Sequence, residues 1–477
     1  MSAVAAPRQT PRVSGVSVAR ETLLRGLRTD GLLLQGAAGS DIAKFTFNRR
    51  TAYVIKHPEY ADHVLHGAVD RYHKSVEYEL LRSVVGLSLF TDEDESWRRH
   101  RMIINPVLAK RHLTRLFELM LAPIDAFTAK LDDGRDRIEL DMTHAMTELT
   151  LDVVGSALFG HGMADLARRI GPNVTAGLRA AERATRLMLL LNPPPWLVRL
   201  SARVVDRTPF LPPPIGRLHK IMRSIDTMVW DVIRARQDHP DDTEDLLGLL
   251  LSARDEHGNK LPLKRVRDEA ATFMLAGHET TANALSWMWY LLALNTEARD
   301  RMLAEVDSVL GADRQPTFDD VAQLKWTQAC FEEAMRMFPP AWLVPRVCVQ
   351  DDVIDGHRIR RGATILIPIH ALHHDERFWP QPETFDPTRF LPEHVKQHHR
   401  SAYLPFGGGR RICAGKAFAL IEGTLVTALM SRQFVYDLKP GHPVEPEATL
   451  TLRPRYGLKM VARRRGAETA TANATAA

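Results

Sequence analysis

The chain has 477 residues, of which 45% are hydrophobic and 25% charged, with a formal net charge of +5. This balance is typical of a soluble globular protein, and the length allows one large domain or two to three ordinary ones. The charge is modest and no basic stripe alternates with aromatic residues, which argues against nucleic-acid binding. Three cysteines are too few for a disulfide framework and favour a reducing compartment.

The N-terminal region predicts a weakly structured lead-in over residues 1–40, with one short amphipathic helix near residues 21–27. It has no apolar segment like that of a signal peptide, and no run of about 18 apolar residues elsewhere predicts a membrane span. Aromatic and β-branched residues then predict two strands, at 45–47 and 52–55. Pro58 is suited to the first turn of the helix that should follow.

Between about residues 95 and 335, apolar residues recur at three- and four-residue spacing, which predicts a mostly helical region. The helices at 141–158 and 223–236 are the clearest. Prolines at 193–195 and 212–214 bracket a segment that cannot be one long helix. Its apolar residues leave two interpretations open, a surface loop or a lid over an apolar pocket.

Strand patterns return between 345 and 370, divided by the turn pair Asp355 and Gly356, and a long proline-rich stretch follows over 378–405. Long loops in compact domains are usually functional. The alanine- and threonine-rich residues 466–477 predict a disordered tail. Without internal repeats or changes in composition, the sequence favours one domain over 41–465, mainly α with a smaller β-rich lobe (α+β).

Cys413 follows three consecutive glycines, precedes Gly415, and lies just before an apolar helical pattern. Glycines let the backbone approach something flat and large, and the start of a helix favours a thiolate. One thiolate without cysteine or histidine partners at suitable spacing cannot form a zinc site, but it can be the protein ligand of a haem iron. Cys330 and Cys348 lie in helical and strand-like runs and are predicted to be buried apolar groups.

The segment 276–281 lies inside a strong helical pattern, although glycine and adjacent threonines are poor helix-interior residues. Thr280 can donate to the carbonyl of Ala276 and so loosen the helix into a bulge or groove. Glu279 and Thr280 would then present an acid and a hydroxyl suited to relaying protons. The alternative interpretation is an ordinary helix.

Two further pairs of residues have helical spacing. Glu333 and Arg336 lie three residues apart among apolar residues, so they predict a buried ion pair that needs another partner, for which Arg389 is a candidate. Trp97 and Arg101 lie four residues apart. They form either part of a solvated basic helix face or a pair of donors to a buried carboxylate.

These segments, in this order along the chain, resemble the cytochrome P450 superfamily of haem-thiolate monooxygenases, and the resemblance covers roughly residues 40–460. The cysteine segment matches the family signature at Phe406, Gly409, Arg411, Cys413 and Gly415. The fold implied is the cytochrome P450 fold, with haem b, iron protoporphyrin IX, between the long central helix and the helix after the cysteine loop. The chain resembles the soluble bacterial members of the family, which lack a membrane anchor. This resemblance implies a cytoplasmic location.

The resemblance also implies roles for individual residues. Cys413 would be the axial ligand of the haem iron, in a loop bounded by Phe406 and Gly415, and Glu279 and Thr280 would deliver protons to dioxygen. Three other groups have assigned roles: haem propionate binding by Trp97, Arg101, Arg346 and Arg411; a substrate pocket at Ala276, Gly277, Leu343 and Val344; and a structural role for Glu333, Arg336 and Arg389.

The implied reaction inserts one oxygen atom from dioxygen into a lipophilic small molecule, by hydroxylation or epoxidation. Electrons would come from a separate ferredoxin or flavodoxin with its reductase, for which Arg410, Arg411 and Lys416 suggest a basic docking face. Three alternatives stay open: a peroxygenase or isomerase on the same fold, a haem sensor without turnover, and a haem-free protein in which Cys413 is structural.

Overall fold

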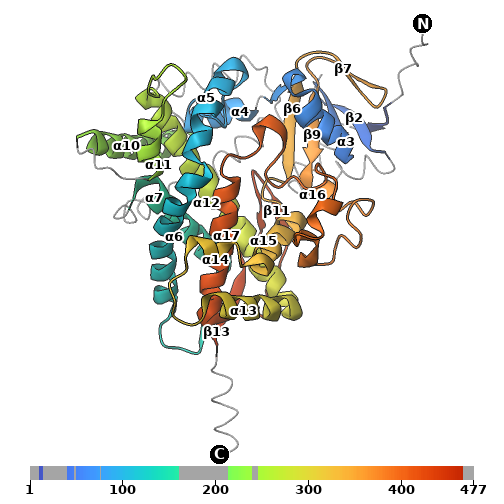
Figure 1. Ribbon diagram of the computed structural model, residues 1–477. Coiled ribbons are helices and arrows are strands. Elements are labelled where there is room, and N and C mark those ends of the chain that lie inside the picture. The colour runs from blue at the N-terminus through green and yellow to red at the C-terminus, as the bar shows by residue number, and fades with distance from the viewer. Residues whose placement is uncertain are drawn as a thin grey trace, which may run out of the picture.

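The computed structural model describes residues 10–13, 40–47, 50–75, 77–160, 213–238 and 245–465. Within them the chain forms a large helical lobe and a smaller lobe built around a sheet, as Figure 1 shows. The predicted architecture, mainly α with a smaller β-rich lobe, is therefore confirmed. The helix predicted near 21–27, the segment 193–212 and the tail 466–477 lie outside the described residues.

The sheet of the smaller lobe has six strands within the described residues, in the order β1-β2-β3-β9-β6-β4. The two strands predicted from aromatic and β-branched residues are β2 and β3, and they pair antiparallel with Phe45 opposite Ala52. Pro58 lies in the first turn of α3, as predicted. The strands are β1 (Arg12–Val13), β2 (Ile42–Phe47), β3 (Arg50–Ile55), β4 (Tyr72–Lys74), β6 (Leu343–Cys348) and β9 (Thr364–Pro368).

A hairpin at the edge of this lobe consists of β7 (Asp352–Ile354) and β8 (His357–Ile359). Asp355 and Gly356 connect the two strands with φ angles of 45° and 76°. A two-residue hairpin of this type requires positive φ at both central positions, which aspartate and glycine tolerate. The turn expected from the sequence at this pair is therefore present.

The helical lobe contains the long central helix α12 (Leu263–Leu294) and the helix that follows the cysteine loop, α17 (Lys416–Gln433). No helix in the described ranges combines the length and apolar character needed to cross a membrane. The other helices are α3 (Pro58–Asp62), α4 (Glu77–Val85), α5 (Asp94–Val107), α6 (Lys110–Leu131), α7 (Met142–Phe159), α10 (Pro213–Asp238), α11 (Leu246–Ser252), α13 (Thr296–Leu310), α14 (Phe318–Val321), α15 (Lys325–Met337) and α16 (Ile369–His373).

Short helices and small sheets complete the described chain. A three-stranded sheet has the order β10-β13-β5, and β11 pairs with β12 in a hairpin close to α12. Their bounds are β5 (Arg137–Asp141), β10 (Phe434–Leu438), β11 (Pro446–Ala448), β12 (Leu452–Pro454) and β13 (Lys459–Arg464), and the short helices are η1 (His63–Gly67), η2 (Val69–Arg71), η3 (Pro387–Phe390), η4 (Val395–Gln397) and η5 (Gly409–Arg411).

The ends of α7 follow directly from its sequence. The carboxylate of Asp141 accepts hydrogen bonds from the backbone N–H groups of Thr143 and His144, which would otherwise lack helical partners. Gly160 ends the helix with φ of 80°, a conformation that glycine adopts without strain. Between these caps, α7 makes extensive contact with α12.

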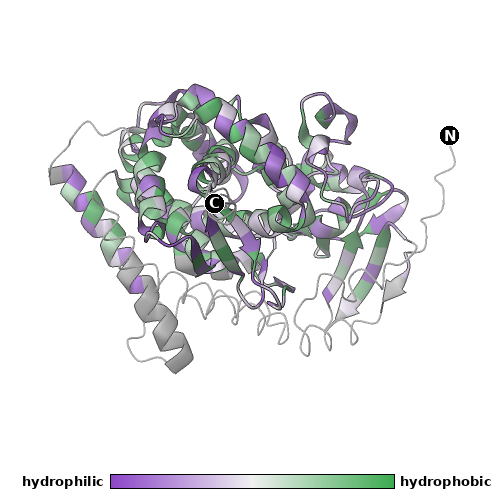
Figure 2. Ribbon diagram, turned by 90° about the horizontal axis from the view of Figure 1, so that it is seen from below, coloured by the Kyte–Doolittle hydropathy of each residue, from purple (hydrophilic) through white to green (hydrophobic). Residues whose placement is uncertain are grey.

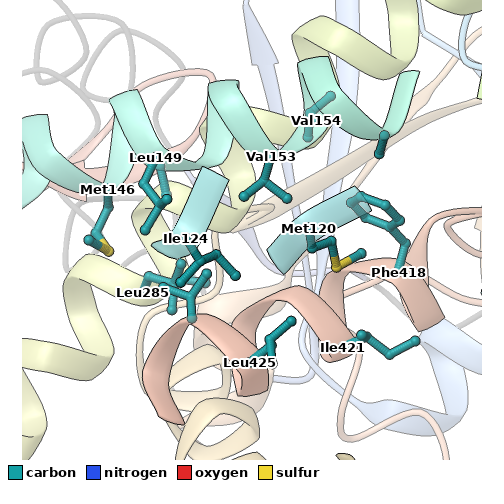
Figure 3. Packing of buried hydrophobic residues seen from close by; sticks show 14 of the residues in the cluster. Met120, Ile124, Met146, Leu149, Val153, Val154, Leu285, Phe418, Ile421 and Leu425 are labelled. Atoms are coloured by element: carbon teal, nitrogen blue, oxygen red, sulfur yellow. The ribbon is translucent and has the colours of Figure 1, made fainter. Parts of the chain in front are cut away.

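A continuous apolar core fixes α12 and α17 in the helical lobe. Figure 3 shows side chains from α6, α7, α12 and α17 converging on one region, among them Met120, Val153, Leu285, Phe418 and Leu425. In Figure 2, hydrophobic residues lie mainly where the helices face one another and hydrophilic residues mainly on the outside. Burying each such side chain stabilises the fold by roughly 1.5–3 kcal/mol, so the core holds both helices in place.

Two glycines permit unusually close contacts within this core. A Cβ atom at Gly423 of α17 would lie 2.3 Å from the Phe331 ring of α15, so only glycine fits there. A Cβ atom at Gly277 of α12 would lie 3.1 Å from Val154 of α7. The Cβ direction of Gly277 therefore points at α7, and its place in a substrate pocket stays a prediction.

Candidate functional site

The cysteine loop connects the proline-rich stretch to α17. Cys413 is exposed, whereas Cys330 in α15 and Cys348 in β6 are buried as predicted. The backbone N–H of Cys413 donates to the carbonyl of Phe406 at 2.9 Å, which closes the loop. The loop therefore leaves Cys413 accessible, in contrast to the two cysteines that fill the core.

Gly409 allows the cysteine loop to lie against η1. Its φ is 67°, and a Cβ atom at this position would lie 1.8 Å from the carbonyl oxygen of Leu65. Its N–H donates to Nε2 of His66 at 2.9 Å. Because that nitrogen accepts, it is unprotonated, and a neutral His66 anchors the loop to the smaller lobe. Sequence reasoning missed His66, since nothing near it marks it as a partner of a glycine more than 300 residues away.

Two opposing effects set the chemistry of the Cys413 thiol. The surrounding protein raises its pKa by desolvation, while the backbone N–H of Gly415 and the charges of Arg101 and Lys416 act to lower it. The net direction is upward. A metal that binds the sulfur removes the proton outright, so this thiol suits a ligand that becomes a thiolate on coordination.

Three cations lie close together where the sheet of the smaller lobe meets the cysteine loop. In the antiparallel pair β4 and β6, Lys74 lies directly opposite Arg346, which is only 8% exposed. Burial lowers the pKa of Lys74 to about 7. The positive charges of Arg411 and Arg346 lower this pKa further, whereas the carboxylates of Glu93 and Asp92 act to raise it. Like charges directly opposite each other in a sheet are destabilising, so this arrangement favours an anionic ligand.

The four predicted propionate-binding residues differ in their partners. Arg411 forms an ion pair with Glu93, and its guanidinium lies 5.3 Å from the centroid of the buried Trp97 ring. In the described part of the chain, neither Arg101 nor Arg346 has a carboxylate partner, and Arg346 donates to the carbonyl of Pro345 at 2.9 Å. These two guanidinium groups are thus available to external carboxylates, which they would bind strongly.

The central helix carries the predicted acid and hydroxyl. Thr280 Oγ1 donates to the carbonyl of Ala276 at 2.7 Å, the bond that the sequence predicts. Thr150 of α7 donates to the carbonyl of His278 at 2.9 Å. Nevertheless α12 remains α-helical from Leu263 to Leu294, so the expected bulge in the backbone is absent. Threonine hydroxyls can share a helical carbonyl without displacing its backbone partner, which explains the difference.

The side chains around this motif face in different directions. Ala276 is exposed, whereas Leu275 and His278 on either side of it are buried. Glu279 Oε1 accepts a hydrogen bond of 3.0 Å from Thr451, which lies between β11 and β12. Sequence reasoning missed Thr451, because the contact crosses 172 residues and a threonine in a short hairpin has no distinctive pattern.

The two other predicted pocket residues, Leu343 and Val344, face opposite sides of β6. Side chains alternate along β6, and Val344 packs into the core of the smaller lobe with Ile365 and Ile367. Leu343 points the other way, is half-buried, and packs against the cluster of Trp342 with the β11–β12 hairpin. Strand periodicity makes this outcome necessary, since neighbouring residues on a strand face opposite sides.

A charge network lies behind the cysteine loop, and its two central residues, Glu333 and Arg336, are fully buried. Arg336 donates to both oxygens of Glu333, at 2.7 and 2.8 Å, and to the carbonyls of His373 and Pro382 at 2.7 Å each. Arg389 Nε lies 3.5 Å from Glu333 Oε1, so the structure brings the three charged residues together. Burial raises the pKa of Glu333, and the hydrogen bonds and charge of Arg336 oppose this effect.

His373 connects this network to the cysteine loop. Its Nδ1 lies 3.0 Å from the carbonyl of Arg336, and its Nε2 accepts from the backbone N–H of Leu404 at 2.9 Å. One partner can only accept and the other can only donate, so the ring is neutral with its proton on Nδ1. Burial likewise lowers the pKa of His373 far below its ordinary value. Sequence reasoning missed this residue.

Comparison with known proteins identifies the class. The cytochrome P450 family model matches residues 38–460. A protein assigned as cytochrome P450 132 of Mycobacterium tuberculosis is 48% identical over 454 residues, covering 95% of this chain and 97% of the relative. Cyclooctatin synthase of Streptomyces melanosporofaciens is 32% identical over 451 residues, covering 93% and 94%. The chain therefore belongs to the cytochrome P450 family.

Solved structures agree with this assignment. The crystal structure of the cytochrome P450DA heme domain matches with a TM-score of 0.78 and 28% identity, covering 89% of this chain and 90% of that one. Family membership makes the protein a haem-thiolate monooxygenase, an oxidoreductase that uses dioxygen, a substrate and a redox partner. Its cofactor is haem, iron protoporphyrin IX.

The residues present fit this cofactor. One exposed thiol lies within 3.9 Å of the Cβ position of Gly415, in a loop where glycine keeps the backbone close. Among the described residues, the guanidinium groups of Arg101 and Arg346 have no carboxylate partner, and Lys74 of β4 lies opposite Arg346 of β6. These cations match a ligand that brings two carboxylates. The site thus offers one sulfur that can bind the haem iron and several cationic side chains that can bind the propionates.

Proposed function

We propose that Cys413 is the axial thiolate ligand and that Arg101, Arg346, Trp97 and Arg411 hold the haem propionates. The exposure of Cys413, in a chain whose other cysteines are buried, is the observation that carries this proposal. Haem bound at this position supplies oxygen-activating chemistry, because a thiolate ligand favours O–O cleavage. Phe406 and Gly415 bound the loop, and Glu333, Arg336 and Arg389 support it from behind.

Glu279 and Thr280 are proposed to move protons on the side of α12 that Ala276 exposes. Adjacent residues on a helix point in directions about 100° apart, so the acid and the hydroxyl flank one groove. The bond from Thr280 to the carbonyl of Ala276 holds that hydroxyl close to the exposed alanine. This pair favours a monooxygenase over the peroxygenase, isomerase and sensor alternatives, which do not require proton delivery to dioxygen.

The substrate is proposed to be a lipophilic small molecule that undergoes hydroxylation or epoxidation. Three apolar groups support this class: Ala276, the half-buried Leu343, and Leu450, which is 37% exposed at the tip of the β11–β12 hairpin. Pockets for such ligands are mostly apolar with few polar groups. One relative is named for the synthesis of cyclooctatin, which supports a role in the biosynthesis of a small molecule.

The electron donor is proposed to be an acidic ferredoxin or flavodoxin that docks beside the cysteine loop. A cavity of about 320 Å³ there is lined by the loop glycines together with His66, Arg400, Arg410 and Lys416. Arg410 contacts Asp70 at 3.3 Å and Arg400 contacts Asp62 at 2.6 Å, so part of this charge is already paired. Exposed Lys416 therefore carries most of the attraction in this proposal.

The test combines ligand titration with turnover. A panel of lipophiles is added to the ferric haem protein, and displacement of the iron-bound water is followed in the visible spectrum. Bound compounds are then assayed with dioxygen and a ferredoxin–reductase pair or with hydrogen peroxide alone. Oxygenated product that requires the reductase supports the proposal, whereas equal turnover with peroxide alone indicates a peroxygenase and binding without any turnover indicates a sensor.

The docking proposal has its own test. Lys416→Ala should raise the KM for an acidic ferredoxin while leaving substrate binding unchanged, and the effect should diminish at high salt because exposed charges are screened. The matched control is Lys439→Ala, which removes an exposed lysine paired with Glu139 in another part of the molecule. Equal KM values for the wild type and Lys416→Ala would contradict a docking role for this residue.

A further inference from the structure

Thr451 stands between Glu279 and a second residue of α12. Its hydroxyl donates to Glu279 Oε1 at 3.0 Å and accepts from Asn283 Nδ2 at 3.1 Å. Thr451 is 6% exposed and Asn283 is 4% exposed, so both groups are shielded from water. Because an amide N–H₂ can only donate, the hydrogen of the Thr451 hydroxyl is left to point at the carboxyl group.

The turn that carries Thr451 is held by bonds that do not involve its hydroxyl. Leu452 N donates to the carbonyl of Pro340 at 3.0 Å, and Trp287 Nε1 donates to the carbonyl of Leu452 at 3.1 Å. Trp342 Nε1 donates to the carbonyl of Thr449 at 3.0 Å. Backbone and tryptophan contacts therefore fix the turn, and the loss of one hydroxyl should leave it in place.

A glutamate side chain has several rotatable bonds, so an acid that must face one groove needs to be held there. Hydrogen bonds to charged groups are stronger than neutral ones, and burial strengthens them further. Asn283 lies one helical turn after Glu279, so it and the carboxyl share one side of α12. Together the three groups form a chain that runs from Asn283 through Thr451 to Glu279.

We propose that Thr451 is a positioning residue for proton delivery, because its hydroxyl holds the carboxyl of Glu279 on the hairpin side of the groove. Asn283 orients that hydroxyl. The hairpin that exposes Leu450 thus also sets the position of the acid, so one turn carries both the apolar contact surface and the residue that positions the proton donor of α12. This inference rests on the proposed function of Glu279.

The test compares Thr451→Val, which keeps the shape and loses the hydroxyl, with Thr451→Ser, which retains the hydroxyl. The matched control is Thr449→Val, because the Thr449 hydroxyl bonds within the turn, to the carbonyl of Thr451 at 3.0 Å. Each variant is loaded with haem, and the spectral Kd for substrate, the product formed per dioxygen consumed and the hydrogen peroxide released are measured. A crystal structure of Thr451→Val locates the Glu279 side chain independently of activity.

The expected result is that Thr451→Val binds substrate as the wild type does, but forms about tenfold less product per dioxygen, with the difference released as peroxide. That ratio is the rate equivalent of one hydrogen bond to a charged group. Thr451→Ser should restore most of the loss, Thr449→Val should cause none, and the crystal structure should show Glu279 turned away from the hairpin.

Two outcomes overturn the inference and one overturns its basis. If Thr451→Val forms as much product per dioxygen as the wild type while Glu279→Gln forms less, Thr451 does not position the acid and the role of Glu279 stands. If Thr449→Val loses as much coupling as Thr451→Val, the effect belongs to the hairpin as a whole. If Glu279→Gln itself retains full coupling, the proposed function of Glu279 is wrong.

Discussion

Glu269 of α12 is a buried acid whose replacement should change how stability depends on pH. It is 0% exposed, and its Oε1 accepts from the backbone N–H of Leu89 at 2.5 Å and lies 3.3 Å from Nε2 of the buried His100. Its Oε2 has no hydrogen-bond partner in the described part of the chain. Burial raises its pKa to about 8, while the Leu89 N–H and Arg265 act to lower it and Asp268 and Asp92 act to raise it.

The sign of the effect follows from the proton balance. An unfolded chain releases this proton near pH 4.5, but the folded protein keeps it until about pH 8. The contribution of Glu269 to the free energy of unfolding is therefore intact below the lower value and is lost as the pH rises through this window. At about 1.4 kcal/mol per tenfold change, the loss amounts to roughly 3–5 kcal/mol, with the larger figure an upper bound.

Glu269→Gln isolates the pH-dependent contribution of Glu269 to the free energy of unfolding. Glutamine has the same shape and keeps an acceptor for the Leu89 N–H, but it does not ionise. Urea unfolding midpoints are measured from about pH 5 to about pH 9, with the same haem content in every sample. Midpoints are compared because a large haem protein need not unfold in two states. Relative to the wild type, the variant should gain stability steadily as the pH rises. The control Glu118→Gln, on an exposed carboxylate, should follow the wild type. Parallel curves for the wild type and Glu269→Gln would refute the reasoning.

Three further substitutions have definite expected outcomes. Gly409→Ala would place a methyl group against the carbonyl of Leu65 at a positive φ, so haem occupancy by absorbance should fall sharply, and normal occupancy would contradict the loop geometry. Arg336→Lys cannot reproduce the paired bonds to Glu333 and should lower the unfolding midpoint by the equivalent of about 3–5 kcal/mol; an unchanged midpoint would argue against a buried pair. Cys330→Ala should leave the haem spectrum unchanged at a cost of about 1 kcal/mol in stability, because that thiol only fills the core.

Local signals in the sequence predicted much of the fold. Aromatic and β-branched runs located β2 and β3, and helical spacing located α7 and α12, because those elements carry their own periodicity. The exposed Cys413 and the hydrogen bond from Thr280 to Ala276 were likewise readable from neighbouring residues. Features that depend on residues within one or two turns of each other are therefore accessible from sequence.

Features that arise from distant contacts were not accessible. Lys74 lies opposite Arg346 because of the register of β4 against β6. The hydrogen bond between Thr451 and Glu279 depends on where the β11–β12 hairpin packs. The contact of Gly277 with Val154 depends on how α12 packs against α7, and the packing of Val344 with Ile365 and Ile367 depends on the alternation along β6. In each case tertiary geometry decides the role, and no local pattern reports it.

Haem ligation by Cys413 is the central claim, and the optical spectrum of the reduced carbonyl complex tests it most directly. The wild type and the variants Cys413→Ser, Cys330→Ser and Cys348→Ser are prepared with equal amounts of haem. The wild type, Cys330→Ser and Cys348→Ser should show the red-shifted Soret band of a thiolate-ligated haem, and Cys413→Ser should lose it. A thiolate spectrum that persists in Cys413→Ser, or disappears in either of the other variants, would contradict the assignment.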